Sequence, residues 1–252
     1  MMNHFASKLL LLILALAGLS SADAQTYSGS RKFDGVHKNE LDGTLSGGYN
    51  VVTGAFFGES FTYTRHLTDR WSIHGAEQVQ FLKWLFSTDV TGTYRLPVGK
   101  KSNLYIDGRF IYNRYQRWKM NETIANLSVQ MEWNYVDLRT GISYKRYVMS
   151  GVHDKFGAYF TDDAYAEPLE MTLGIGVNIR ERASRWNLGL FLRNYDQFYY
   201  DNWNINWGLR FHTTLTPQLK LYSEFNVRPA GNLSQVATRY ETALKLGVHY
   251  VW

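Results

Sequence analysis

Apolar and polar residues alternate at every second position over most of this chain. In the segment 169–180, the apolar set is Leu169, Met171, Leu173, Ile175, Val177 and Ile179, and the intervening set is Glu170, Thr172, Gly174, Gly176, Asn178 and Arg180. A period of two is typical of a β-strand with one apolar and one polar face. The segment is long enough to cross a bilayer as a tilted strand, which needs roughly 9 to 11 residues.

Twelve segments with this alternation follow one another along the chain. They are 41–51, 57–67, 71–82, 86–96, 104–113, 126–133, 138–148, 169–180, 186–192, 203–212, 219–228 and 238–252. Residues 97–102 are predicted to turn the chain, and 149–168 lack the period and are predicted to form a loop. Short links near Asp69, Gly99, Val136, Ala183 and Pro217 alternate with mostly longer ones near Lys119, Phe160, Tyr199 and Gly231. Short turns on one side and long loops on the other are typical of outer-membrane barrels.

The segment 71–82 fits this pattern less well than the others. Glu77 shares its face with Trp71 and Ile73 and would point toward lipid near the middle of the strand. A charged side chain in that position costs about 2 kcal/mol or more. We therefore expect a β-bulge near Gly75 that changes the direction of Glu77.

The first residues have the composition of a secretory signal peptide. Lys8 precedes an unbroken apolar run over 9–17, and Ala22 and Ala24 form a small-x-small cleavage site. We assign 1–24 to the signal peptide, 25–40 to a polar periplasmic lead-in and 41–252 to the barrel. The apolar run is too short to span a membrane as a helix, and no later stretch reaches 18 apolar residues, which excludes a helical membrane protein.

The last segment closes on aromatic residues, Tyr250 and Trp252. A final alternating strand with a terminal aromatic resembles the assembly signal of bacterial outer-membrane β-barrels. The resemblance implies an all-β fold, a transmembrane antiparallel up-and-down β-barrel of about 12 strands in the bacterial outer membrane. It also implies two partners, the outer-membrane lipids and the outer-membrane assembly machinery. The alternative is a soluble secreted β-sandwich or lipocalin-like barrel, whose strands alternate in the same way.

Composition supports an exported β protein. The chain contains no Cys, only 4 Pro, and 14 Phe, 18 Tyr and 8 Trp residues. Many aromatic residues with few prolines suit long strands whose ends lie at membrane interfaces. The net charge of +5 is spread along the chain without a run, so we expect no nucleic-acid partner and consider small anionic solutes instead.

If the apolar faces point to lipid, the polar faces line the lumen. The basic residues on those faces are Arg95, Arg109, Arg139, Lys145, Arg180, Arg193, Arg210, Lys220, Arg228, Arg239 and Lys245, and the acidic ones are Asp42, Asp89, Asp107, Glu132, Glu170, Glu224 and Glu241. This excess of eleven basic over seven acidic residues favours a narrow, weakly anion-preferring channel for small solutes. Small twelve-stranded barrels with arginine-lined lumens resemble the acidic-oligosaccharide porins in outline, but the chain carries no motif of that family. The alternative is a plugged structural or ligand-binding barrel, in which these charges pair across strands.

An outer-membrane lipid-modifying enzyme is a third and weaker hypothesis. His66, His74, His212 and His249 lie on polar faces, each within a few residues of a periplasmic turn or the end of the chain. Family knowledge places the catalysis of such enzymes at the outer leaflet, so these histidines lie on the wrong side. We therefore predict no catalytic residues and no cofactor. His66 and His74 are expected to be diagonal neighbours, an arrangement that suits a metal pair or a pH-sensitive latch.

Overall fold

The structure is a computed structural model that describes residues 39–50, 54–81, 85–99, 102–116, 119–149, 164–194, 205–230 and 238–252. The predicted signal peptide lies outside these residues. Twelve strands are present: β1 Asn39–Asn50, β2 Gly54–His66, β3 Trp71–Gln80, β4 Leu85–Gly99, β5 Ser102–Tyr115, β6 Met120–Glu132, β7 Val136–Met149, β8 Ala164–Asn178, β9 Trp186–Arg193, β10 Asn206–Thr214, β11 Leu219–Ala230 and β12 Thr238–Val251.

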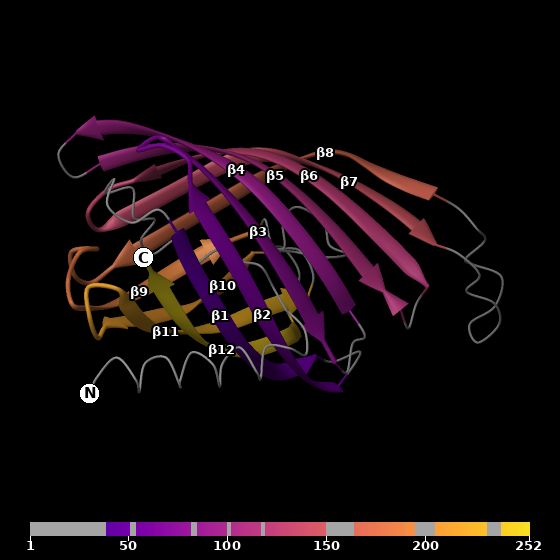
Figure 1. The fold of residues 1–252 in the computed structure, drawn as a ribbon. Helices are drawn as coiled ribbons and strands as arrows, with labels where there is room; N and C mark the ends of the chain where they lie inside the picture. The colour runs from indigo at the N-terminus through magenta and orange to yellow at the C-terminus, as the bar shows by residue number, and fades with distance from the viewer. Residues whose placement is uncertain are drawn as a thin grey trace.

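The twelve strands form one closed barrel in sequence order. Each strand pairs antiparallel with its neighbours, and β1 closes the wall against β12 from Glu40 opposite Val251 to Asn50 opposite Glu241. Figure 1 shows β4 to β8 as long strands, whereas β9 and β10 are short. No helix among the described residues is long and apolar enough to cross a membrane.

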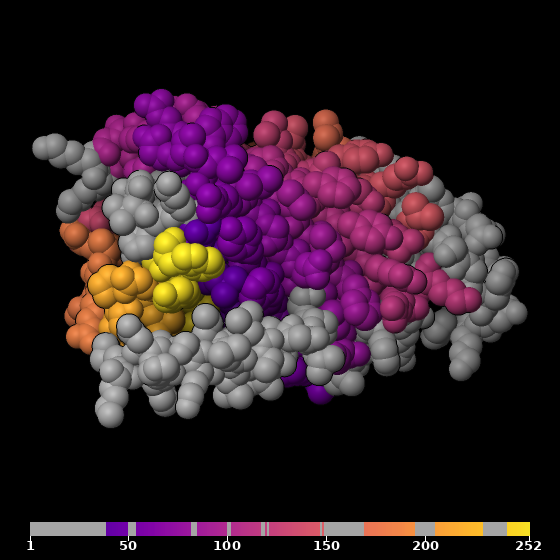
Figure 2. All heavy atoms as spheres, in the orientation of Figure 1, coloured from indigo at the N-terminus to yellow at the C-terminus, as the bar shows by residue number. Residues whose placement is uncertain are grey.

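The two faces of the wall differ in polarity. The exposed outer face carries large apolar side chains on many strands, for example Leu45, Phe110, Leu190 and Leu246. The interior instead carries buried Ser, Thr, Asn, Gln, His and charged residues. On the side shown in Figure 2, the side chains of the indigo to magenta strands form a continuous outer surface. An apolar exterior around a polar interior is the arrangement of a barrel whose solvent on the outside is lipid.

Several predicted boundaries move because backbone pairing continues beyond the regular alternation. β1 begins at Asn39, within the predicted lead-in, and β8 begins at Ala164, within the predicted loop. β4 continues through Pro97, where we expected a turn, and a register shift between Pro97 and Gly99 accommodates the proline.

The predicted bulge near Gly75 is absent. β3 pairs without a register shift with β2, from His66 opposite Ser72 to Gly58 opposite Gln80, and its pairing with β4 is equally regular. Since the alternation is uninterrupted, Glu77 stays on the outer face and is exposed. The wall thus carries a carboxylate on its apolar side.

Candidate functional site: the charged interior of the barrel

The candidate site is the interior face, and strand pairing determines which residues reach it. Sixteen of the eighteen charged residues predicted for the lumen lie on the inward-facing side of their strands: Arg95, Arg109, Arg139, Lys145, Arg193, Arg210, Lys220, Arg228, Lys245, Asp42, Asp89, Asp107, Glu132, Glu170, Glu224 and Glu241. The side chain of Arg239 is outside the described part of the chain. A role for these residues in lining a pore stays a prediction.

Arg180 is the exception among the described residues. β8 ends at Asn178, so the alternation no longer controls the direction of Arg180. Its side chain is exposed, and its guanidinium carbon lies 3.7 Å from the centre of the Trp186 ring. Arg180 therefore belongs to the exposed turn between β8 and β9, and its predicted place in the lumen is wrong.

Three interior carboxylates and one interior arginine escaped the sequence analysis. They are Glu40, Glu122, Asp137 and Arg182. With them, the described interior holds ten acidic residues and ten basic ones, because Arg182 from the β8–β9 turn joins the nine basic residues of the strands. The predicted excess of basic groups is therefore not found in the described interior. For Glu40 and Asp137, the start of a strand hides the alternation that would have identified them.

Two interior carboxylates without exposed surface each lie beside an arginine and accept a hydrogen bond from a threonine, Thr91 for Asp89 and Thr93 for Asp107. The Arg109 guanidinium lies 2.5 Å from Asp89, and Arg139 Nη2 lies 3.8 Å from Asp107 and donates to Ser128 Oγ at 2.7 Å. Asp89 and Asp107 have an exposed fraction of 0%, whereas the arginine side chains are each 10% exposed. In both pairs the arginine, and not the carboxylate, keeps some exposed surface in the barrel interior.

A second cluster joins strands that are far apart in the wall. Arg210 on β10 donates to Asp137 on β7 at 2.6 Å, and Arg182 donates to the same carboxylate oxygen at 3.0 Å. A side chain on Gly176, which lies between them, would collide with both Asp137 and Arg210. Burial lowers the pKa of Arg182, but the carboxylates of Glu132 and Asp137 outweigh burial and raise it above its ordinary value.

Two more pairs have equally buried members. Arg193 Nη2 lies 2.6 Å from Glu224, which also lies 3.9 Å from Lys245, and Lys145 lies 2.6 Å from Glu170. The side chains of Arg193 and Glu224 are 9% and 10% exposed. Buried pairs of this kind are costly to break, because removal of one partner leaves the other charge without compensation.

Histidines and carboxylates meet at the seam between β1 and β12. Glu40 lies 2.5 Å from His66 on β2 and 3.5 Å from His249 on β12. His249 also approaches Asp42 at 3.3 Å. The register makes His66 and His74 diagonal neighbours, as expected, but His66 is paired with Glu40. No group of three or more His, Cys, Asp or Glu within the described ranges is suited to hold a metal ion.

The interior of β2 and β3 differs from the rest because none of its described side chains is Asp, Glu, Lys or Arg. It presents Phe56, Gly58, Ser60, Thr62, Thr64 and His66 on β2, and Ser72, His74, Ala76, Gln78 and Gln80 on β3. The charged clusters lie on the other strands, so the interior has a neutral side and a charged side.

Comparisons with known proteins show similarity in fold alone. No family model matches the chain, and no curated protein matches its sequence. The KdgM porin matches with 9% identity and a TM-score of 0.54, over 84% of this chain and 99% of the porin. The KdgM porin in complex with disordered oligogalacturonate gives 10% identity, the same coverages and the same score. The translocator domain of autotransporter NalP from Neisseria meningitidis matches with 11% identity and a TM-score of 0.54, over 86% of this chain and 89% of that domain.

These similar structures are barrels of the bacterial outer membrane. The predicted fold class, a transmembrane antiparallel β-barrel of twelve strands, is confirmed.

Proposed function

We propose that the protein is a narrow outer-membrane channel for small hydrophilic solutes, with a weak preference for anions. One observation carries the preference. The side chains of Arg109 and Arg139 keep some exposed surface, whereas the carboxylates of Asp89 and Asp107 beside them have none. A solute in the lumen therefore meets the positive member of each pair, even though the described interior has as many acidic as basic groups.

The cost of burying charge supports a channel over a purely structural barrel. Taking ion pairs out of water costs several kcal/mol per ion, and well-packed apolar residues often stabilise a protein better. A barrel that serves only as a scaffold gains no stability from ten acidic and ten basic interior groups that apolar residues could replace. Contact with water and polar solutes gives these groups a function.

The fold is consistent with this proposal. Twelve strands lie between the filled eight-stranded barrels and the wide porins of sixteen or more strands, so a lumen of this size suits small solutes. One of the similar structures is the KdgM porin in complex with disordered oligogalacturonate.

A plugged structural or ligand-binding barrel is the second candidate, and a specific observation favours it. The pairs formed by Arg193 and Lys145 are buried, and the short side chains of Ser72 and Thr91 are also buried. Interior groups that are packed in this way leave less room for a solute.

Conductance in planar bilayers separates the two candidates. We expect ion-selective steps from the refolded protein, whereas silence over a wide voltage range would favour the plugged barrel. The decisive variant is Arg109→Gln combined with Asp89→Asn, which removes one charge of each sign. If the exposed guanidinium sets the preference, the reversal potential shifts toward cations, and the shift shrinks as salt rises because of screening.

The matched control is Arg193→Gln combined with Glu224→Gln. This pair is also neutralised, but its two members are about equally exposed. We expect a smaller shift of the reversal potential than for the Arg109 variant. Equal shifts in the two variants, or no shift in either, would contradict the proposed origin of the preference.

A further inference from the structure

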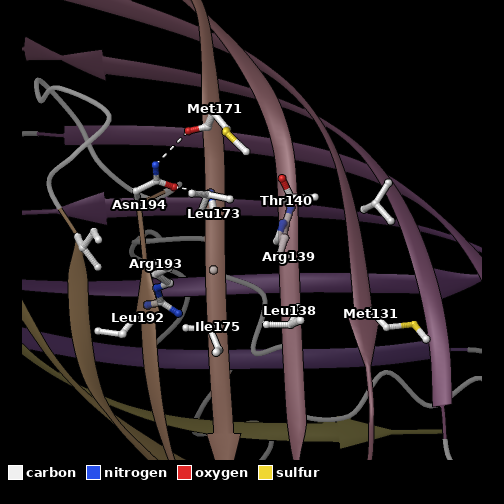
Figure 3. Close-up of a pocket in the computed structure, with 13 residues that line it drawn as sticks. Met131, Leu138, Arg139, Thr140, Met171, Leu173, Ile175, Leu192, Arg193 and Asn194 are labelled. Carbon is white, nitrogen blue, oxygen red and sulfur yellow. Dashed lines mark hydrogen bonds between the residues drawn. The ribbon is translucent and has the colours of Figure 1, made fainter.

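A groove with a volume of about 640 Å³ lies along the outer face of the wall, where β6 to β9 pass one another (Figure 3). Its lining is almost entirely apolar. The side chains that face outward there include Met131, Leu138, Met171, Leu173, Ile175 and Leu192.

The groove crosses the place where the described pairing of β8 with β9 ends. β8 has 15 residues and β9 has 8, and the two strands pair only from Gly174 opposite Arg193 to Asn178 opposite Gly189. Within the described ranges, β8 therefore continues past the end of its neighbour.

Asn194 covers the edge of β8 immediately beyond the end of β9. Its side-chain oxygen accepts a hydrogen bond from the Leu173 backbone N–H at 2.6 Å, and its Nδ2 donates to the Met171 carbonyl at 3.0 Å. Its own backbone N–H donates to the Leu173 carbonyl at 3.0 Å. The dashed lines of Figure 3 show the two side-chain bonds. Asn194 thus continues the contact between the two strands by one residue beyond the Gly174–Arg193 pair.

The described lining of the groove offers no charge to a ligand. Arg139 and Arg193 lie along it, but both belong to the inward-facing set, and their guanidinium groups are engaged with Ser128 and Glu224. The side-chain amide of Asn194 is used by the backbone of β8. A ligand in this groove is therefore held by apolar contact.

We propose that the groove binds one acyl chain of a phospholipid in the surrounding bilayer. It is continuous with the exposed apolar surface formed by Leu169, Val177 and Leu190, which faces lipid in an outer-membrane barrel. A chain in a groove is contacted on several sides, so it buries more apolar surface and gains more dispersion energy than a chain on a convex wall. This site is independent of any current through the lumen.

Photochemical labelling tests the proposal. The full barrel is reconstituted in vesicles that contain phosphatidylcholine with a diazirine in one acyl chain, then illuminated and mapped by peptide mass spectrometry. We expect several-fold more lipid adduct at Met171, Leu173 and Leu192 than at Leu246, an exposed outward residue of β12. Equal labelling at the two places would show ordinary bilayer contact and overturn the proposal.

A filled groove supplies the second test. Leu173→Trp is expected to remove the excess labelling, whereas Leu246→Trp leaves it unchanged, with heat-modifiable migration as the check that each barrel is folded. Met171→Phe provides a smaller filling if Leu173→Trp does not fold. Excess labelling that persists in a folded filled variant, or cross-linked protein dimers in place of lipid adducts, would overturn the proposal.

Discussion

The ring of Tyr222 on β11 lies over Gly247 on β12, and its hydroxyl reaches across that glycine to β1. The hydroxyl donates a hydrogen bond to the Asp42 carboxylate and lies 2.6 Å from Thr44 Oγ1. A side chain on Gly247 would occupy the space of the ring. The Tyr222 side chain therefore connects β11 to β1 across β12 at the closing seam. It fits there because Gly247 has no side chain.

Gly247→Ala is expected to destabilise the barrel by about 1 to 3 kcal/mol, because the added methyl group forces the Tyr222 ring away from Asp42. The free energy of unfolding in denaturant, measured on barrels refolded in lipid vesicles, checks this value. Gly43→Ala is the control, since a Cβ there meets nothing within 4 Å. Similar losses in the two variants would show that the effect does not come from the ring.

Charge reversal of Arg193 and Arg210 together to Glu is expected to destabilise the barrel without changing its selectivity. Both arginines are buried and paired, with Glu224 and Asp137, and breaking such a pair typically costs about 3 to 5 kcal/mol. The unfolding free energy and the reversal potential are measured on the same preparation. A well-folded double variant with a shifted reversal potential would instead place these arginines among the groups that select ions.

Replacing Glu77 by Leu is expected to stabilise the barrel by about 1 kcal/mol, because the carboxylate is exposed on the lipid side of β3. The same unfolding assay measures the change. Asp69→Leu, in the exposed turn that follows β2, serves as a control in which a carboxylate is removed outside the strands. A loss of stability in the Glu77 variant would mean that the carboxylate has a favourable partner in the assembled membrane.

Trp252→Lys is expected to lower the yield of assembled barrel while leaving export intact. The backbone of Trp252 exchanges two hydrogen bonds with Asn39, at 3.1 and 3.0 Å, and its ring stacks on Tyr250 with centroids 5.7 Å apart. The heat-modifiable fraction in isolated membranes measures assembly. Trp133→Lys, at the end of β6, is a matched exposed tryptophan away from the seam. Equal yields for the two variants would count against a special role for Trp252.

The period of two was sufficient to predict the wall, because each inward or outward direction follows from parity once a strand is recognised. The same rule explains the errors. Applied beyond the end of β8, the rule wrongly predicted that Arg180 faces the lumen. It also led us to expect a bulge that would turn Glu77 away from lipid, although the pairing of β3 is regular. Some charged residues lie in apolar surroundings. In the sequence, such a residue breaks the alternation in the same way as a bulge in the strand, so the alternation alone cannot distinguish the two.

The pairing of the interior charges could not be predicted in the same way. Arg210 reaches Asp137 across two intervening strands, and Arg182 enters the interior from a turn. Such contacts depend on the curvature of the closed wall and on space left by residues such as Gly176. The position of a residue in the sequence predicts which face of a strand it occupies. It does not predict which groups meet across the interior of a closed barrel.

The antiparallel seam between β1 and β12 also has a consequence for folding. Every other pair of neighbours is a local hairpin, whereas this pair joins the two strands that are farthest apart along the chain. The entropy of closing so large a loop makes such an encounter slow, and until it occurs both strands present unpaired backbone edges on which other chains can pair. We therefore expect closure of this seam to be the slowest step in forming the barrel, and the time before it to be the interval in which the chain needs protection from aggregation.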